Sequence, residues 1–181
     1  MHGISIKQKG FTFIEILIIV MIMGIVTMAA LPVINSTLGY SKLSSAARVF
    51  VAGLEYAANL SIRYRRSFAV DSDIENNSFK IVDQDPLGTS GTIRLSNEPP
   101  VNEDNVVFNY IFDQWYIEDL DTIGTFSGVN IDAGPGKLSF YPDGHCEAGE
   151  NSYQDSRFVL RLGDLTTTIV VDGISGRIWV E

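Results

Sequence analysis

A long apolar run dominates the N-terminal part of the chain. Between Phe11 and Leu31 the only charge is that of Glu15, and two threonines are the only other polar residues. As an α-helix rising about 1.5 Å per residue, this run spans about 32 Å, close to the hydrocarbon thickness of a bilayer. A buried helix of a globular core is the alternative, which the length of the run and its N-terminal position disfavour. The run therefore predicts a transmembrane helix over residues 11–31.

The charges around this run indicate its orientation. Lys7 and Lys9 precede it, and no charge follows until Lys42. Basic residues beside a span stay on the cytoplasmic side, so the N-terminus is expected inside and everything after residue 40 outside. Three hypotheses remain open: a secretory signal cleaved near Ala29 and Ala30, an uncleaved anchor, or a chain processed close to the start of the run.

Glu15 distinguishes these hypotheses. A charge within an apolar span costs about 2.5–3.5 kcal/mol, so an acid there indicates a function. If the chain is cut after Gly10, Phe11 becomes the N-terminus and Glu15 stands four residues along, on the same helical face. The positive end of the helix dipole would lower the free-energy cost of placing the carboxylate in the apolar span. An amine–carboxylate pair between neighbouring subunits would set their axial offset, which predicts assembly.

The helical pattern continues beyond the apolar run, to about residue 66. Pro32 removes a hydrogen-bond donor and is expected to kink or locally unwind the helix. A mostly apolar stripe then recurs at helical spacing, and polar residues lie opposite it. The stripe is Leu43, Ala47, Phe50, Leu54, Ala57 and Ser61, and the polar face is Ser44, Arg48, Glu55, Asn59 and Arg63. Residues 32–66 are predicted to be an amphipathic continuation packed on a downstream domain, with Arg63, Arg65 and Arg66 as a solvated helix end.

Residues 67–181 show short β-prone runs separated by turn signals. Such runs predict an antiparallel sandwich or a strongly curved sheet, and with the helix an α+β fold. The clearest hairpin has its loop over residues 172–176. The predicted strands are Ser67–Val70, Ser78–Val82, Thr92–Leu95, Val106–Phe112, Trp115–Ile117, Val129–Ile131, Leu138–Tyr141, Arg157–Leu162, Thr166–Val171 and Arg177–Val180.

Composition excludes several classes of function. The chain has 181 residues, 45% of them hydrophobic, and a net charge of −9, which argues against a nucleic-acid partner. The single Cys146 excludes an intramolecular disulfide and any multi-cysteine metal site. His145-Cys146-Glu147 is expected to be a surface loop, and the acidic loops are expected to be solvated, although calcium ligation by them stays open. No catalytic residue, cofactor or metal is expected.

The segment around Gly10 and Phe11 resembles the N-terminal signal of a known protein family. The segment KG/FTFIEILIIVMIMGIVTMAALP is similar to the class III signal of type IV pilins and pseudopilins. The resemblance implies that residues 1–10 are a leader, and that a prepilin peptidase cuts between Gly10 and Phe11 and methylates Phe11. It also implies assembly roles for Phe11, Glu15 and Pro32, since pilin helices commonly carry a proline just past the apolar run.

Motifs in the C-terminal half narrow the group of pilin-like proteins that the chain resembles. FYPDG at Phe140–Gly144, FVLRL at Phe158–Leu162 and TTIVVDGISGRIWV near the end resemble type II secretion protein H and the related FimT-type minor pilins. This implies a minor pseudopilin, single-pass in the bacterial inner membrane with a periplasmic domain, that supports protein export across the outer membrane. Its implied partners are other pseudopilins or pilins, the prepilin peptidase and the inner-membrane assembly platform.

The alternative is a minor pilin of a type IV pilus, FimT- or FimU-like, acting in pilus priming or DNA uptake. Removal of Lys7 and Lys9 with the leader changes the formal charge from −9 to −11. Such a charge repels DNA at long range. The sequence therefore favours the secretion pseudopilus over the pilus.

Overall fold

The chain has an α+β fold, as the sequence predicts. The computed structural model describes residues 11–85, 99–110, 113–149 and 151–181, without the side chains of 29–36, 151 and 152. The predicted strand Thr92–Leu95 and the predicted leader over residues 1–10 lie outside these residues. The chain divides into two compact units, residues 1–38 and 39–181, and each is described by itself below.

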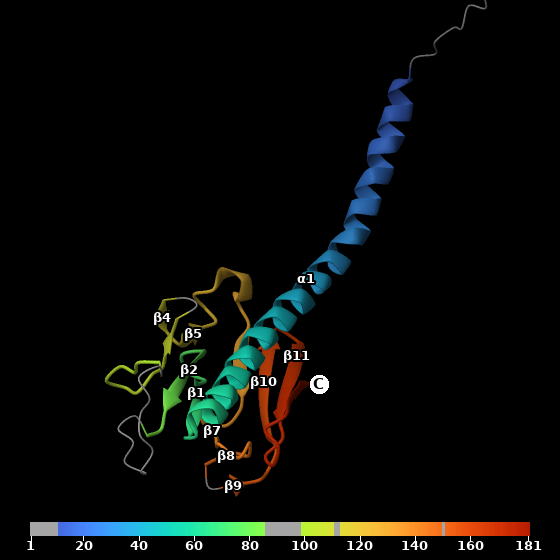
Figure 1. Ribbon diagram of the computed structural model, residues 1–181. Coiled ribbons are helices and arrows are strands. Elements are labelled where there is room, and N and C mark those ends of the chain that lie inside the picture. The colour runs from blue at the N-terminus through green and yellow to red at the C-terminus, as the bar shows by residue number, and fades with distance from the viewer. Residues whose placement is uncertain (1–10, 86–98, 111–112, 150) are drawn as a thin grey trace, which may run out of the picture. The chain divides into compact units, whose positions relative to one another are not determined.

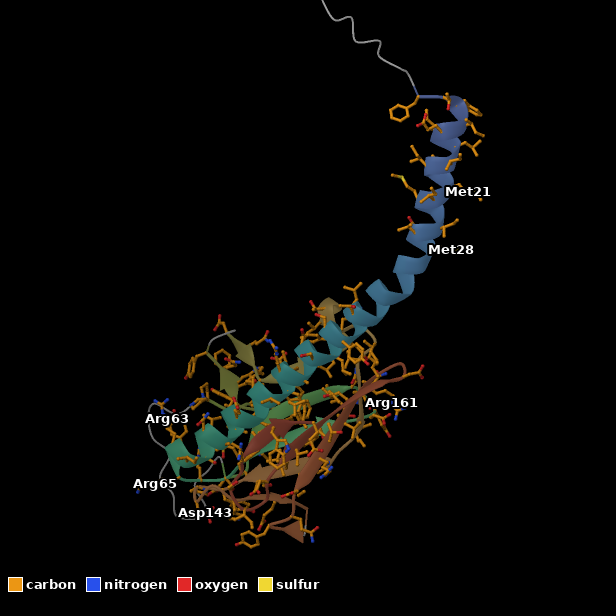
Figure 2. All side chains as sticks on the ribbon, turned by 90° about the vertical axis from the view of Figure 1, so that its right-hand side faces the viewer. Met21, Met28, Arg63, Arg65, Asp143 and Arg161 are labelled. Carbon is orange, nitrogen blue, oxygen red and sulfur yellow. The ribbon has the colours of Figure 1, made fainter. Side chains whose placement is uncertain are left out.

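The helix α1 covers Phe13–Tyr64. In the second unit, all six residues of the predicted apolar stripe are buried, which confirms the predicted contact face. Figure 1 shows this cyan-to-green part of α1 against the strands of the globular unit. The helix ends two residues before the predicted limit, because Arg65 adopts a left-handed conformation with φ 54° that stops the helical bonding pattern. Figure 2 shows Arg63 and Arg65 at this end of α1.

Two antiparallel sheets form the β-rich part of the second unit. Among the described residues the larger sheet has six strands in the order β5-β2-β1-β7-β8-β9, and the smaller has four in the order β12-β11-β10-β6. A short hairpin, β3–β4, and a 3₁₀ turn over Gly124–Phe126 complete the unit. The larger sheet comprises β1 (Phe68–Asp73), β2 (Ser78–Asp83), β5 (Ile117–Asp119), β7 (Lys137–Phe140), β8 (Cys146–Ala148) and β9 (Asn151–Ser152). The smaller sheet and the hairpin comprise β6 (Asn130–Ala133), β10 (Ser156–Leu162), β11 (Leu165–Val171), β12 (Ile178–Val180), β3 (Phe108–Asn109) and β4 (Gln114–Trp115).

Two predictions within this part are wrong. The segment 145–147 is no surface loop: Cys146 is buried and begins β8, which pairs with β7. In the predicted strand Val106–Phe112, the described residues 106–110 form only β3, preceded by two isolated bridges at Val106 and Val107. Both segments lack a long alternation of apolar and polar residues, so their pairing depends on neighbouring strands that the local sequence does not specify.

Phe50 on α1 lies where the two sheets meet the helix. Its ring centroid is 4.6 Å from that of Phe79 on β2 and 4.8 Å from that of Phe158 on β10. All three side chains are fully buried. Gly53, one turn further along α1, allows a close approach, since a Cβ there would lie 2.6 Å from the Phe79 ring. The core therefore joins the helix to both sheets through aromatic contacts.

Arg66 is not part of a solvated helix end, which corrects the sequence prediction. Its Nη2 lies 2.6 Å from Oδ2 of Asp83, and the two side chains are 2% and 0% exposed. Its Nη1 donates a hydrogen bond to the carbonyl oxygen of Asp85 at 3.0 Å. A charge inside a protein persists when it is paired and hydrogen-bonded. The exit of α1 is thus tied to the end of β2 by a buried ion pair.

Candidate assembly site at the start of the first helix

The first part of α1 exposes a long apolar surface. Every residue from Phe13 to Met28 is exposed, and Glu15 is the only charged residue among them. Figure 2 shows their side chains projecting from the helix, with Met21 and Met28 labelled. A continuous exposed apolar surface of this kind marks a contact with another protein or with lipid. The segment therefore presents a surface suited to contact with protein or lipid.

Thr12 and Glu15 form a reciprocal pair at the start of this helix. The backbone N–H of Glu15 donates to Oγ1 of Thr12 at 3.3 Å, and the N–H of Thr12 donates to Oε2 of Glu15 at 3.4 Å. The carbonyl oxygen of Thr12 also accepts from the N–H of Glu15 at 3.1 Å. This is a capping box, in which two otherwise unpaired backbone donors of a helix start are satisfied. Thr12 is consequently the N-cap of α1.

Sequence reasoning missed this second role of Glu15. The signal was present, because Thr-Phe-Ile-Glu ahead of an apolar run has the spacing of a capping box. The cap also changes the expected geometry of Phe11. The sequence analysis places Phe11 on the same helical face as Glu15, whereas α1 begins at Phe13 and Phe11 precedes the cap. Phe11 therefore lies outside the helix.

The other predicted site residues are distributed as follows. Gly10 lies outside the described residues, and Phe11 is 74% exposed. Oε1 of Glu15 accepts no hydrogen bond from any residue that the structure describes, so one carboxylate oxygen is left for a further donor. Pro32 lies within the bounds of α1, and its side chain is not among those described.

Membrane insertion was considered for the described helix residues. Among these, no helix segment combines the length and the hydropathy that a bilayer span requires. The predicted span over residues 11–31 extends into residues 29–36, whose side chains are not described.

His145 lies in a polar cluster of the second unit. Its ring stacks on Tyr141 at 4.4 Å, its Nδ1 contacts a carboxylate oxygen of Asp143, and its Nε2 lies 3.6 Å from Oε1 of Glu147. The two carboxylates approach opposite edges of the ring and cannot converge on one ion. In agreement, the described residues contain no group of three acidic, histidine or cysteine side chains placed to hold a metal.

Cys146 next to this cluster is chemically protected. Burial, followed by the nearby negative charge of Asp172, raises the pKa of its thiol to about 11. The thiol donates a hydrogen bond to the carbonyl oxygen of Asp172 at 3.3 Å. A thiol in such surroundings carries little thiolate at neutral pH, so its role is structural.

The chain was compared with known families and structures. Residues 6–31 match the family model described as the prokaryotic N-terminal methylation motif. No curated protein matches the chain at a significant level. Two crystal structures of the type IV minor pilin FimU from Pseudomonas aeruginosa strain PAO1 are similar in fold.

The first of these, in space group P21, has a TM-score of 0.50 and 16% sequence identity, covering 78% of this chain and 90% of FimU. The second, in space group P65, has a TM-score of 0.48 and 14% identity, covering 77% and 92%. At these identities the likeness to the P21 structure concerns the fold alone. The N-terminal methylation motif thus stands at the head of an exposed apolar helix, on a chain whose fold is similar to that of the type IV minor pilin FimU.

Proposed function

We propose that this chain is a minor pilin, a structural subunit that joins a type IV pilus through its N-terminal helix. The observation that carries the proposal is the methylation motif over residues 6–31, followed by a helix whose residues from Phe13 to Met28 are all exposed. Burial of an apolar helix surface of this extent against other helices or lipid lowers the free energy of the system.

In this proposal a prepilin peptidase cuts between Gly10 and Phe11 and methylates the new amine of Phe11. The uncut chain sits in the bacterial inner membrane with its N-terminus cytoplasmic and residues 39–181 on the periplasmic side. Glu15 keeps one oxygen on the N–H of Thr12, and its Oε1 receives the Phe11 amine of a neighbouring subunit. The pair sets the axial offset of adjacent helices.

A second candidate is a minor pseudopilin of a type II secretion system. The resemblance of the C-terminal motifs and the net charge favour it, and the sequence analysis preferred it. The fold shared with FimU supports the pilus role better, so the pilus role becomes our main proposal. Both candidates use the same helix and the same processing.

Two measurements, the intact mass of the mature protein and its incorporation into filaments, test the processing and the helix packing that both candidates share. We expect the mature protein to have lost residues 1–10 and gained one methyl group, whereas cleavage near Ala30 would remove about thirty residues. Glu15→Gln should leave processing intact and strongly reduce incorporation into filaments. Glu55→Gln, the matched change at an exposed position further along α1, should leave incorporation unchanged. Normal incorporation of Glu15→Gln would contradict the proposed role of the carboxylate.

Crosslinking distinguishes the two assemblies that the subunit could join, a type IV pilus and a type II secretion pseudopilus. A photoreactive residue at Ile16, beside Glu15 on the exposed helix, should trap the subunits that pack next to it in cells. Crosslinks to pilus subunits would support the main proposal. Crosslinks to secretion pseudopilins alone would replace it with the second candidate.

A further inference from the structure

The smaller sheet of the globular unit ends in an open edge formed by β12. The N–H and carbonyl of Glu181 both pair with Thr168, and the carbonyl of Arg177 accepts from Asp172. Residues in an antiparallel ladder point their bonding groups alternately toward and away from the partner strand. Ile178 and Val180 therefore direct their N–H and carbonyl groups away from β11. β12 is the outermost strand of the sheet, and no described residue bonds to these four groups.

The edge formed by β12 is short, at three residues, but lacks several other devices that protect a sheet edge against a further strand. Natural sheets blunt their edges with lysines, prolines, bulges or a covering segment. β12 consists of Ile178, Trp179 and Val180, without a lysine or proline, and its register with β11 is regular. Val180 is 50% exposed. The edge therefore presents two donors and two acceptors to an incoming backbone.

A groove lies beside the edge, between β12 and α1. Its volume is about 360 Å³, and its apolar lining comes from Leu43, Ala47 and Val180, with Tyr40 at the exposed margin. Side chains of an added strand alternate between the two faces of the sheet, so every second one would enter this groove. The groove accordingly selects apolar side chains at alternate positions.

Arg48 gives the groove a positive charge. It lines the groove with Ser44, Thr166 and Thr167, it is exposed, and it makes no hydrogen bond or ion pair with any residue that the structure describes. The acid nearest the edge in sequence, Glu181, is held by Arg157 at 3.4 Å and by the indole N–H of Trp179 at 3.3 Å. A carboxylate on an incoming segment would find Arg48 available.

We propose that β12 is a docking edge for an extended segment of another protein, which adds to the smaller sheet as a further strand. The segment pairs its backbone with Ile178 and Val180, places apolar side chains in the groove and places a carboxylate against Arg48. Main-chain bonds of this kind give affinity, and the groove with its cation gives specificity. The proposal is independent of the processing and helix packing described above.

The probe is an acetylated and amidated peptide of sequence TVTETVT, which places its glutamate on the same face as its valines, with TVTKTVT as its lysine counterpart. The isotope-labelled full chain in non-ionic detergent micelles is titrated with each peptide while amide chemical shifts are recorded. We expect TVTETVT to shift the amides of Ile178 and Val180 and to protect them from hydrogen exchange. TVTKTVT should bind about two- to fivefold more weakly, the size of one exposed charge pair. Shifts confined to other residues, equal binding of both peptides, or no shift at millimolar peptide would overturn the proposal.

Three variants test the edge and the cation separately. Val180→Pro removes one outward donor without touching the β11 ladder, since proline is tolerated where the N–H faces away from the sheet. It should abolish the shifts at Ile178. Arg48→Glu should reverse the preference, so that TVTKTVT binds better than TVTETVT. Arg63→Glu, the same charge reversal on α1 outside the groove, should leave the preference unchanged; an equal effect of Arg48→Glu and Arg63→Glu would show a general charge effect and refute the site.

Discussion

The buried ion pair between Arg66 and Asp83 gives a sharp test of how α1 is fixed to the larger sheet. Arg66→Met leaves the Asp83 carboxylate in a site where that side chain is 0% exposed. Removal of one partner of a buried pair costs about 3–5 kcal/mol. The hydrogen bond from Arg66 to the Asp85 carbonyl is lost as well, at about 1 kcal/mol. We therefore expect Arg66→Met to lower the free energy of unfolding by about 5 kcal/mol.

The assay is urea unfolding of the full chain in non-ionic detergent at pH 7, followed by tryptophan fluorescence. Both tryptophans, Trp115 and Trp179, lie in the globular unit and report on its unfolding. Asp83→Asn is the partner change, because an amide oxygen can still accept the N–H bond from Asp85 that Asp83 Oδ1 now accepts at 3.0 Å. The double variant buries no charge and should recover about 2 kcal/mol relative to Arg66→Met. A loss below about 1 kcal/mol in Arg66→Met, or a double variant no more stable than Arg66→Met, would refute the reasoning.

Three further predictions concern the helix cap, the aromatic core and the buried ionisable groups. Thr12→Ala should lower the helix content of the N-terminal segment at a cost of about 1 kcal/mol, visible in amide exchange of the first turn, whereas Thr12→Ser should restore it. Gly53→Ala should lower the free energy of unfolding by about 1–3 kcal/mol in urea titrations, because its methyl would lie 2.6 Å from the Phe79 ring; an unchanged midpoint would show that the ring moves freely. Burial, followed by the charge of Glu118, raises the pKa of Tyr116 to about 12, so the folded chain keeps a proton that the unfolded chain releases near pH 10. Stability should consequently fall between pH 10 and 12, and Tyr116→Phe should reduce that fall in thermal unfolding measured across this range.

The helix and its contact face were predictable because they depend on short-range periodicity. Leu43, Phe50 and Leu54 recur at helical spacing, and all are buried. The hairpin β11–β12 was predictable for a similar reason, since two apolar strands flank a glycine-containing loop in which Gly176 has φ 64°. Local sequence is sufficient where one element specifies its own buried face.

The remaining features depend on partners far apart in the sequence. Arg66 follows two exposed arginines, and the sequence around it does not indicate that it pairs with Asp83 at the end of β2. β8 and β9 are short, and their pairing follows from the position of β7 and not from alternation. The capping box at Thr12 could have been predicted from the local sequence, but the apolar run after it suggested only an assembly role for Glu15. Of the candidate site, sequence therefore supplied the residues and structure supplied the hydrogen bonds between them.

The helix cap has a consequence for how the proposed subunit matures. Every atom that closes the first turn belongs to Thr12 or a later residue, so severing the chain before Phe11 leaves the cap in place. The peptidase would cut directly before Phe11, which precedes the helix, and would release a chain whose first helical turn is already formed. Cleavage would add the positive charge of the Phe11 amine next to a helix start that is already folded. No refolding step would then be needed between proteolysis and assembly into a filament.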